Sequence, residues 1–162
     1  MPKIILGIDP GIADTGYGVI VVDRGKARCL AYGSIRTESG LDLSVRLVSL
    51  YEQLEKIIEE FHPDISAMEE LFFSKNVRTA IMVGQARGVS LFTISRHGIP
   101  VFHFKPSQVK QAVASYGQAT KIQVQKMVKM ILGLEDIPKP DDAADALAIA
   151  LCAINCQICK KD

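Results

Sequence analysis

Acidic residues follow two apolar stretches of the chain and open a third segment with helical spacing. Asp9 ends the first apolar run, and Glu69 and Glu70 follow a second one. Asp142 and Asp145 are three positions apart, so on a helix they share one face. If the two apolar runs are parallel strands, their carboxyl ends meet at the sheet edge where α/β proteins place their chemistry.

The chemistry that suits such a group of carboxylates is the binding of hard metal ions. Carboxylates within ~4–6 Å of one another raise one another's pKa values unless a cation lies between them. Oxygen ligands select Mg²⁺ or Mn²⁺ rather than zinc. Two such ions about 3.5–4 Å apart hold the attacking water and the leaving oxygen of a phosphodiester. We therefore expect a two-metal nuclease with two Mg²⁺ per active site, for which Mn²⁺ can substitute.

Each acidic residue also has an ordinary structural explanation. Asp141, Asp142 and Asp145 follow Pro140 at a helix start, where acids cap free N–H groups and favour the helix dipole. Asp9, directly before Pro-Gly, is a typical turn residue. Capping does not explain Asp145, which lies one turn into an apolar Ala-Leu-Ala-Ile segment. The group therefore indicates more than any one of its members.

A single α/β domain over residues 1–162 is expected to position these side chains. The 162 residues are 48% hydrophobic and 23% charged, without repeats or Gly/Ser linkers, which is typical of one globular domain. Expected strands are Lys3–Asp9, Gly16–Asp23, Arg28–Arg36, Asp64–Met68 and Ile99–His103. Expected helices are Leu41–Phe61, Ala80–Arg96, Ser107–Tyr116, Ala119–Leu134 and Asp141–Ile158. Three strands as an antiparallel meander, followed by strands alternating with helices, predict a mixed five-stranded sheet flanked by helices.

Positive and negative charges are segregated along the chain. Residues 71–134 contain no Asp or Glu and nine Lys or Arg, whereas the other 98 residues contain all 18 acids and ten bases. The net charge of +1 is therefore the difference between +9 in the middle segment and −8 elsewhere. A basic segment of this kind is typical of phosphate binding, although lysines on solvated helix faces give the same count.

Several short motifs are spread in order over nearly the whole chain. They are Ile4-Ile5-Leu6-Gly7-Ile8-Asp9-Pro10-Gly11, Thr15-Gly16-Tyr17-Gly18, Glu69-Glu70-Leu71-Phe72 with Lys75-Asn76, Gly84-Gln85-Ala86-Arg87-Gly88, Gln108-Val109-Lys110-Gln111 and Asp142-Ala143-Ala144-Asp145-Ala146-Leu147-Ala148. Together these motifs resemble the bacterial RuvC-type Holliday junction resolvases. The resemblance implies a ribonuclease-H-like fold.

The resemblance also implies an activity and partners. It implies a Mg²⁺-dependent endodeoxyribonuclease that resolves four-way (Holliday) DNA junctions by paired symmetric nicks, in homologous recombination and DNA repair. It further implies a homodimer that works with a branch-migration motor of the RuvA and RuvB type, in the cytoplasm. The catalytic, metal-binding carboxylates of the family fall on Asp9, Glu69, Asp142 and Asp145, which favours Glu69 over Glu70.

The residues expected to bind DNA come from the resemblance and from the basic segment. They are Phe72, Lys75, Arg78, Lys110 and Lys121. Lys110 and Lys121 match family lysines and are suited to hold a phosphate or to offset transition-state charge, with solvent-facing lysines as the alternative. Phe72 matches the aromatic that enters the junction centre, where stacking on an unpaired base contributes ~1–3 kcal/mol. Phe73 is the alternative wedge, but we expect it in the core.

Three rival functions remain to be distinguished. The segment from Gly7 to Gly16 also resembles the phosphate loop of actin-like sugar kinases and ATPases, which need a duplicated second lobe that 162 residues cannot supply. A non-catalytic DNA-binding protein would use the basic segment alone and would not need four carboxylates. The ribosomal-RNA-processing nucleases share the opening strand but not the helix with Asp142 and Asp145.

Other features indicate packing rather than chemistry. Three cysteines near the C-terminus have an iron–sulfur spacing, C-x₃-C-x₂-C, but would form one apolar stripe on the last predicted helix, and they suit a reducing cytoplasm. These are Cys152, Cys156 and Cys159. The histidines His62, His97 and His103 have no ligand spacing. The longest apolar run, Ala146–Ile154, is shorter than the ~18 residues of a membrane helix, and no signal peptide is recognisable.

Overall fold

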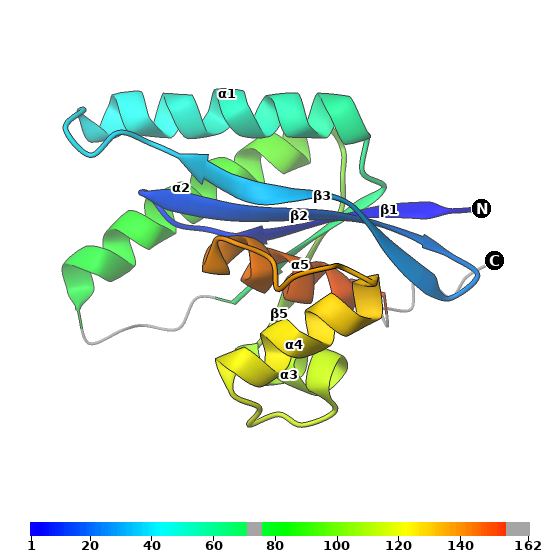
Figure 1. Ribbon diagram of the computed structural model, residues 1–162. Helices are drawn as coiled ribbons and strands as arrows, with labels where there is room; N and C mark the ends of the chain where they lie inside the picture. The colour runs from blue at the N-terminus through cyan, green and yellow to red at the C-terminus, as the bar shows by residue number, and fades with distance from the viewer. Residues whose placement is uncertain (71–75, 155–162) are drawn as a thin grey trace.

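The computed structural model describes residues 1–70 and 76–154 of the chain (Figure 1). Its elements follow the predicted order of strands and helices. They are β1 (Lys3–Asp9), β2 (Asp14–Asp23), β3 (Lys26–Arg36), α1 (Leu43–Phe61), β4 (Ile65–Glu69), α2 (Val77–Arg96), β5 (Val101–Phe104), α3 (Pro106–Ala114), α4 (Lys121–Leu132) and α5 (Asp141–Ala153). The α/β class predicted from the sequence is confirmed.

The five strands form one mixed sheet in the order β3-β2-β1-β4-β5. The pairs β1–β2 and β2–β3 are antiparallel, as the predicted meander requires, and β4 is parallel to both β1 and β5. The register pairs Asp9 with Gly16 on one side of β1 and Ile8 with Met68 on the other. The carboxyl ends of β1 and β4 therefore lie side by side, and Asp9 and Glu69 lie at the same edge of the sheet.

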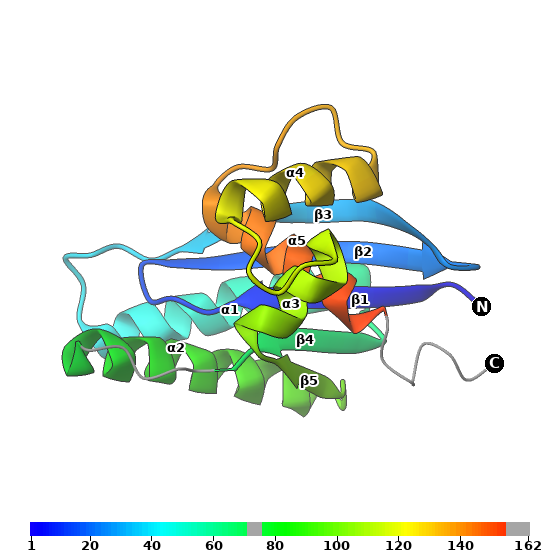
Figure 2. The ribbon, with the colours of Figure 1, turned by 90° about the horizontal axis from the view of Figure 1, so that it is seen from below.

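Helices cover both faces of this sheet (Figures 1 and 2). On one face α1 and α2 pack over a buried cluster that includes Leu6, Ile8 and Val19. On the other face α5, with α3 and α4 outside it, packs over a cluster that includes Ile5 and Ile20. The alternation of side chains along a strand explains the division, because successive residues of β1 point to opposite faces. Among the described residues, no helix is long and apolar enough to span a lipid bilayer.

Helix α5 lies unusually close to the sheet, because glycines of β1 and β2 face an alanine-rich helix. A Cβ added at Gly7 would lie 2.0 Å from the carbonyl oxygen of Ala146, and one added at Gly16 would lie 2.0 Å from that of Asp142. Residues 143, 144, 146, 148, 150 and 153 of the helix are alanines, and all are buried. The absence of side chains on the sheet side lets the start of α5 reach the end of β1.

The helix boundaries lie within two residues of the predicted ones except at the start of α2 and the end of α5. Helix α2 begins at Val77 rather than Ala80, because the side chain of Asn76 accepts a hydrogen bond from the N–H of Thr79 and caps the helix there. The last helix was expected to reach Ile158, and it is described to Ala153. The rest of the predicted helix, which includes Cys156, lies outside the described residues, and so does Cys159, which follows it.

We expect Gly7→Ala to lower the free energy of unfolding by at least about 3 kcal/mol, because the new methyl group meets the backbone of α5, which cannot rotate away. Urea unfolding measures the change. Gly40→Ala is the control, since a Cβ there meets nothing within 4 Å and should leave stability within about 1 kcal/mol of wild type. Equal stability of the two variants would show that α5 is not packed this tightly.

Candidate active site

Three carboxylates meet where the end of β1 faces the start of α5. Asp9 is the last residue of β1, and Asp142 and Asp145 lie on the first two turns of α5. One carboxylate oxygen from each of the three lies within 4.8 Å of the other two. This spacing is that of ligands around a common cation. Among the described residues, these three carboxylates form the group of His, Cys, Asp and Glu side chains that lies close enough together to hold a metal ion.

Glu69 faces the same site from the end of β4. It lines a cavity of about 290 Å³ together with Asp9 and Asp145. Glu70, the alternative left open by the sequence, lies instead beside Arg87 and His103, whose pKa values its charge affects. The two neighbouring glutamates therefore face different surroundings, and Glu69 is the one whose side chain lines the cavity.

Burial and mutual repulsion raise the pKa of every one of these carboxyl groups. The pKa of Asp9 is raised to about 7, chiefly by burial and then by the charges of Asp145, Asp142 and Glu69. Burial also raises the pKa of Glu69, with Asp145 adding to the effect and Lys110 opposing it. The pKa values of Asp142 and Asp145 are raised by burial as well. The site thus holds more negative charge than its own cations balance, a condition that a bound divalent cation relieves.

Two lysines of the basic segment reach this site. The Nζ of Lys121 lies 3.3 Å from an oxygen of Asp145 and 3.5 Å from an oxygen of Asp141. Lys110 lines the cavity, and its charge lowers the pKa of Glu69. Both side chains are therefore placed at the carboxylates rather than on a remote solvated face.

Asp141 and Asp14 belong to the surroundings of the site, and sequence reasoning gave neither a role there. Asp141 was considered as a capping residue, but it binds Lys121 and accepts a hydrogen bond of 3.3 Å from Gln125. The charge of Asp14 raises the pKa of Asp142, second only to burial. Asp14 lies two residues before Gly16, which pairs with Asp9, and this pairing is visible only in the structure.

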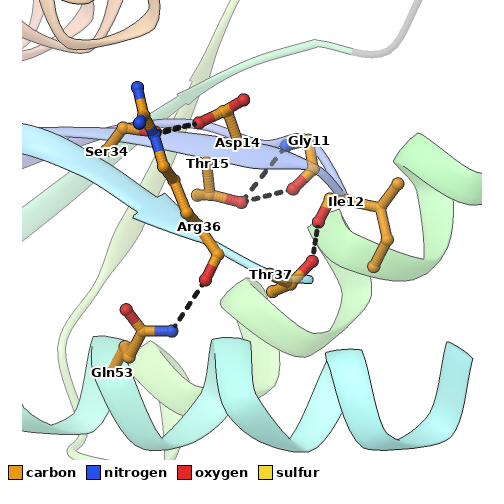
Figure 3. A network of polar contacts seen from close by, with 8 residues as sticks. All are labelled: Gly11, Ile12, Asp14, Thr15, Ser34, Arg36, Thr37 and Gln53. Carbon is orange, nitrogen blue, oxygen red and sulfur yellow. Dashed lines mark hydrogen bonds and ion pairs between the residues drawn. The ribbon is translucent and has the colours of Figure 1, made fainter. Parts of the chain in front are cut away.

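A network of hydrogen bonds fixes the turn that follows Asp9 (Figure 3). The fully buried hydroxyl of Thr15 donates to the carbonyl of Gly11 at 2.5 Å and accepts from its N–H at 3.3 Å. The hydroxyl of Thr37 donates to the carbonyl of Ile12. Because Gly11 and Thr15 bond to each other, the N–H and hydroxyl that a phosphate loop would offer to a nucleotide already have partners inside the protein.

Two further hydrogen bonds tie this turn to β3. An oxygen of Asp14 accepts from Ser34 at 2.9 Å and from the Nε of Arg36 at 3.0 Å (Figure 3). Gln53 of α1 in turn donates to the carbonyl of Arg36 at 3.1 Å. The turn is therefore anchored to the sheet and, through it, to a helix.

The other predicted site residues lie elsewhere or outside the described part of the chain. Arg78 is exposed on the first turn of α2 and lines a groove with Arg46 rather than the carboxylate cavity. The predicted DNA-binding residues Phe72 and Lys75, and the alternative wedge Phe73, fall in residues 71–75, outside the described residues. Cys152 is buried in the core, and two histidines have protein partners: His97 lies 3.1 Å from Glu55, and His103 contacts Arg87.

Comparison with known proteins gives one consistent family. A family model described as "Crossover junction endodeoxyribonuclease RuvC" matches residues 5–153. A protein of that name from Chloroflexus aggregans is 55% identical, covering 91% of this chain and 90% of its own. Another from Ruminiclostridium cellulolyticum is 53% identical, covering 92% and 90%.

Solved structures agree with the sequence matches. The structure of "T. thermophilus RuvC in complex with Holliday junction substrate" superimposes with a TM-score of 0.88 at 39% identity, covering 93% of this chain and 92% of that one. The yeast mitochondrial Holliday junction resolvase Ydc2 superimposes with a TM-score of 0.66 at 17% identity, covering 91% of this chain and 76% of that one, which shows the shared fold. The predicted ribonuclease-H-like fold is confirmed by the first of these matches.

We expect the stability of the protein in EDTA to fall as the pH rises from 5 to 8. Asp9, with a pKa of about 7 when folded and an ordinary value of 3.8, holds its proton more tightly in the folded state. It therefore favours folding at low pH, and this contribution of roughly 2–3 kcal/mol is lost between pH 5 and 7.

Urea unfolding of the wild type and of Asp9→Asn at pH 5 and pH 8 measures this loss. The variant keeps Glu69, Asp142 and Asp145, whose shifts have the same direction, so the difference between the two proteins isolates Asp9. Parallel pH dependences in the two proteins would contradict the expectation.

Proposed function

Because the chain belongs to the RuvC family of crossover junction endodeoxyribonucleases, we propose that its acidic cavity is the nuclease site, with two Mg²⁺ ions as cofactor. The protein is a nuclease that acts on Holliday junctions in DNA recombination and repair. The residues proposed to be catalytic are Asp9, Glu69, Asp142 and Asp145. The observation that supports this assignment is the meeting of three of these carboxylates within 4.8 Å, beside the fourth and two lysines.

The donor set fits hard divalent cations. The ligand atoms offered by Asp9, Asp142 and Asp145 are all carboxylate oxygens, and no Cys or His lines the cavity within the described residues. Such oxygens suit Mg²⁺, for which Mn²⁺ can substitute. The pKa values of all four carboxyl groups are raised, which means that their ionised forms are unfavourable in this site without a cation. When bound, two such ions lower the pKa of an attacking water and stabilise the leaving oxygen.

The lysines supply the contacts of the protein itself to the DNA backbone in this proposal. Lys110 and Lys121 line the cavity that the carboxylates occupy. Their ammonium groups can hold a phosphate over the site and offset the charge that develops when a phosphodiester is cleaved. The ion pair of 3.5 Å with Asp141 holds the half-exposed ammonium of Lys121 beside the cavity. The two lysines therefore orient the phosphate relative to the acidic residues.

Residues outside this cavity are proposed to bind the arms and the centre of the junction. Arg78 is exposed at the start of α2. In the sequence it follows closely after Phe72 and Lys75. We propose that Arg78 and Lys75 contact phosphates and that Phe72 stacks on a base at the junction centre. These roles depend on the family resemblance, since Phe72 and Lys75 are not among the described residues.

A homodimer is supported by one apolar face of α2. Val77, Ile81 and Phe92 are 69%, 57% and 60% exposed, and their spacing places them on one side of the helix. Gly84 and Gly88 lie on the same side, and a Cβ added at either would meet nothing within 4 Å. Exposed apolar side chains flanking an open glycine surface suit the close approach of another helix, and we infer that it is α2 of a second copy. Two copies would supply the two active sites that paired nicks require.

The wider setting follows from the same family membership. We propose that the dimer works with a branch-migration motor of the RuvA and RuvB type, which moves the junction before it is cut. We also propose that residues 1–162 form one nuclease domain. Its DNA substrate in a bacterium lies in the cytoplasm, where we expect the protein to act.

The decisive experiment for the activity compares a synthetic four-way junction with a linear duplex of the same sequence, each incubated with the protein and Mg²⁺. We expect paired symmetric nicks in the junction and none in the duplex. Equal cutting of both substrates would contradict junction resolution, and hydrolysis of ATP would instead support the kinase-like alternative.

Asp9→Asn tests the assignment of the site. We expect cleavage of the junction to fall by at least about a hundredfold, since loss of even an outer contact to a metal site costs ~10–100-fold. Binding of the junction, measured by gel shift in EDTA, should be retained. Asp23→Asn is the control, because this exposed residue lies at the far end of β2, and it should cut as wild type does. Loss of binding together with cleavage in Asp9→Asn would overturn the catalytic role.

Ile81→Glu tests the dimer. We expect the dissociation constant of the dimer to rise at least about a hundredfold, because an unpaired charge buried in an interface costs ~2–5 kcal/mol. Sedimentation of the wild type and the variant measures the change. Met130→Glu, at a 71% exposed position of α4, adds the same charge elsewhere and should leave the dimer intact. An intact Ile81→Glu dimer would place the interface on another surface.

A further inference from the structure

The backbone carbonyl of Glu69 lies opposite a position of β1 that has no N–H to donate. The N–H groups of Ser66 and Glu70 donate to the carbonyls of Pro100, directly before β5, and of Phe104 at its end, so the carbonyl of Glu69 faces the opposite way, toward β1. The register pairs Ile8 with Met68, and one further step pairs Asp9 with Glu69. In a parallel ladder the donor to Glu69 would then be the N–H of residue 10, which is Pro10 and has none.

A side chain of α2 supplies the missing donor. The Nη1 of Arg87 donates to the carbonyl oxygen of Glu69 at 2.7 Å. This hydrogen bond comes from a charged group, and bonds of that kind are stronger than those between neutral groups. The carbonyl of the last peptide of β4, which follows a proposed metal ligand, is therefore held by a helix on one face of the sheet and not by β1, while the N–H of the same peptide donates to Phe104 of β5.

Arg87 is itself fixed by a second strand. Its Nη2 lies 2.8 Å from the Nδ1 of His103 on β5, and Nη1 also lies 3.7 Å from the sulfur of Met68. Burial and the guanidinium of Arg87 lower the pKa of His103, so the neutral ring keeps Nδ1 as an acceptor. The planar guanidinium thus bridges the ends of β4 and β5, a geometry that a lysine cannot reproduce.

We propose that Arg87 is a positioning residue that sets the direction in which the Glu69 carboxylate enters the cavity. It holds the Glu69 peptide in place of the hydrogen bond that Pro10 cannot make, with His103 fixing the guanidinium from β5. The inference rests on the proposed function, in which Glu69 is a metal ligand. Because α2 also carries the apolar face proposed for the dimer, one helix contributes both to the interface and to the site.

Calorimetric titration of the DNA-free protein with Mn²⁺ tests this role without relying on cleavage. We expect Arg87→Met to weaken Mn²⁺ binding by about tenfold, the lower end of the loss seen when outer contacts to metal ligands are removed. Arg87→Lys should recover part of the affinity, since one ammonium can reach the Glu69 carbonyl or His103 but not both. Arg96→Met is the matched control on the same helix, because Arg96 contacts Tyr51 and should leave Mn²⁺ affinity unchanged.

The cycle with Glu69→Gln separates positioning from a general loss of structure. Once the Glu69 carboxylate is gone, adding Arg87→Met should change Mn²⁺ affinity by less than about twofold, because Arg87 acts through that group. The remaining group of Asp9, Asp142 and Asp145 still gives a measurable titration. An equal tenfold loss in both backgrounds, or unchanged affinity in Arg87→Met, would overturn the proposal.

Junction cleavage by the wild type under the same conditions reports separately on the proposed function. If the wild type does not cut the junction while the Mn²⁺ cycle behaves as expected, the proposed function fails and the positioning role stands. If the wild type cuts and the cycle is additive, the positioning role fails alone. Arg87→Lys, which keeps the charge and one hydrogen bond, provides the same comparison should Arg87→Met unfold.

Discussion

Close packing of α5 against β1 and β2 holds carboxylates together against their mutual repulsion. Ionisation of Asp9 is unfavourable at this position, because burial and the neighbouring carboxylates raise its pKa to about 7. Asp9 is nevertheless held beside α5, because Gly7 and Gly16 let the backbone of the helix come so close that there is no room for a Cβ at either position. The free energy of burying an alanine-rich helix face thus offsets the electrostatic cost of placing Asp142 and Asp145 beside Asp9. The acidic site is in this sense a property of the core.

The strand ends that carry the acids need support that the sheet alone does not provide. The turn after Asp9 begins with Pro10, which fixes the backbone but removes a donor from the ladder. On one side of this turn Thr15 and Thr37 bond to the carbonyls of Gly11 and Ile12. On the other side, Arg87 bonds to the carbonyl of Glu69. Side chains therefore complete the hydrogen bonding at the functional edge, where regular strand pairing stops.

The sequence predicted most of the fold, since its signals are local. Apolar runs and turn residues placed all five strands, and β1 was predicted residue for residue at Lys3–Asp9. The carboxylates could be proposed because each follows a recognisable strand or opens a helix. By contrast, the choice between Glu69 and Glu70 could not be made from spacing alone, since adjacent residues of a strand face opposite sides and the sequence does not say which side is occupied. That choice required the family resemblance, and the cavity lining now favours the same residue.

Arg87, Asp141 and Asp14 could not be identified from the sequence, because their roles depend on partners far along the chain. Arg87 appeared in a family motif and in the count of basic residues, and nothing local connected it to Glu69, 18 residues away. Asp141 was indistinguishable from a capping acid until Lys121, on another helix, lay 3.5 Å from it. Contacts of this kind are set by how elements pack, and packing is the information that hydrophobic periodicity does not contain.

The basic segment also has a different meaning once its side chains are located. Counted along the chain, its nine bases suggested a DNA-binding surface of charge +9. Arg87 is half-buried and forms hydrogen bonds with the Glu69 carbonyl and with His103. The guanidinium of Arg96 lies over the rings of Tyr51 and Phe92. These two cations therefore serve the protein, and the charge left for phosphates is smaller than the count. Lys110 and Lys121 differ from them in facing the carboxylate cavity, so the positive charge with the most direct access to a phosphate lies where the negative charge is also greatest. The carboxylates repel a DNA phosphate that these lysines attract, so a cation bound by the carboxylates would strengthen the contact of the phosphate with the cavity in addition to its part in cleavage.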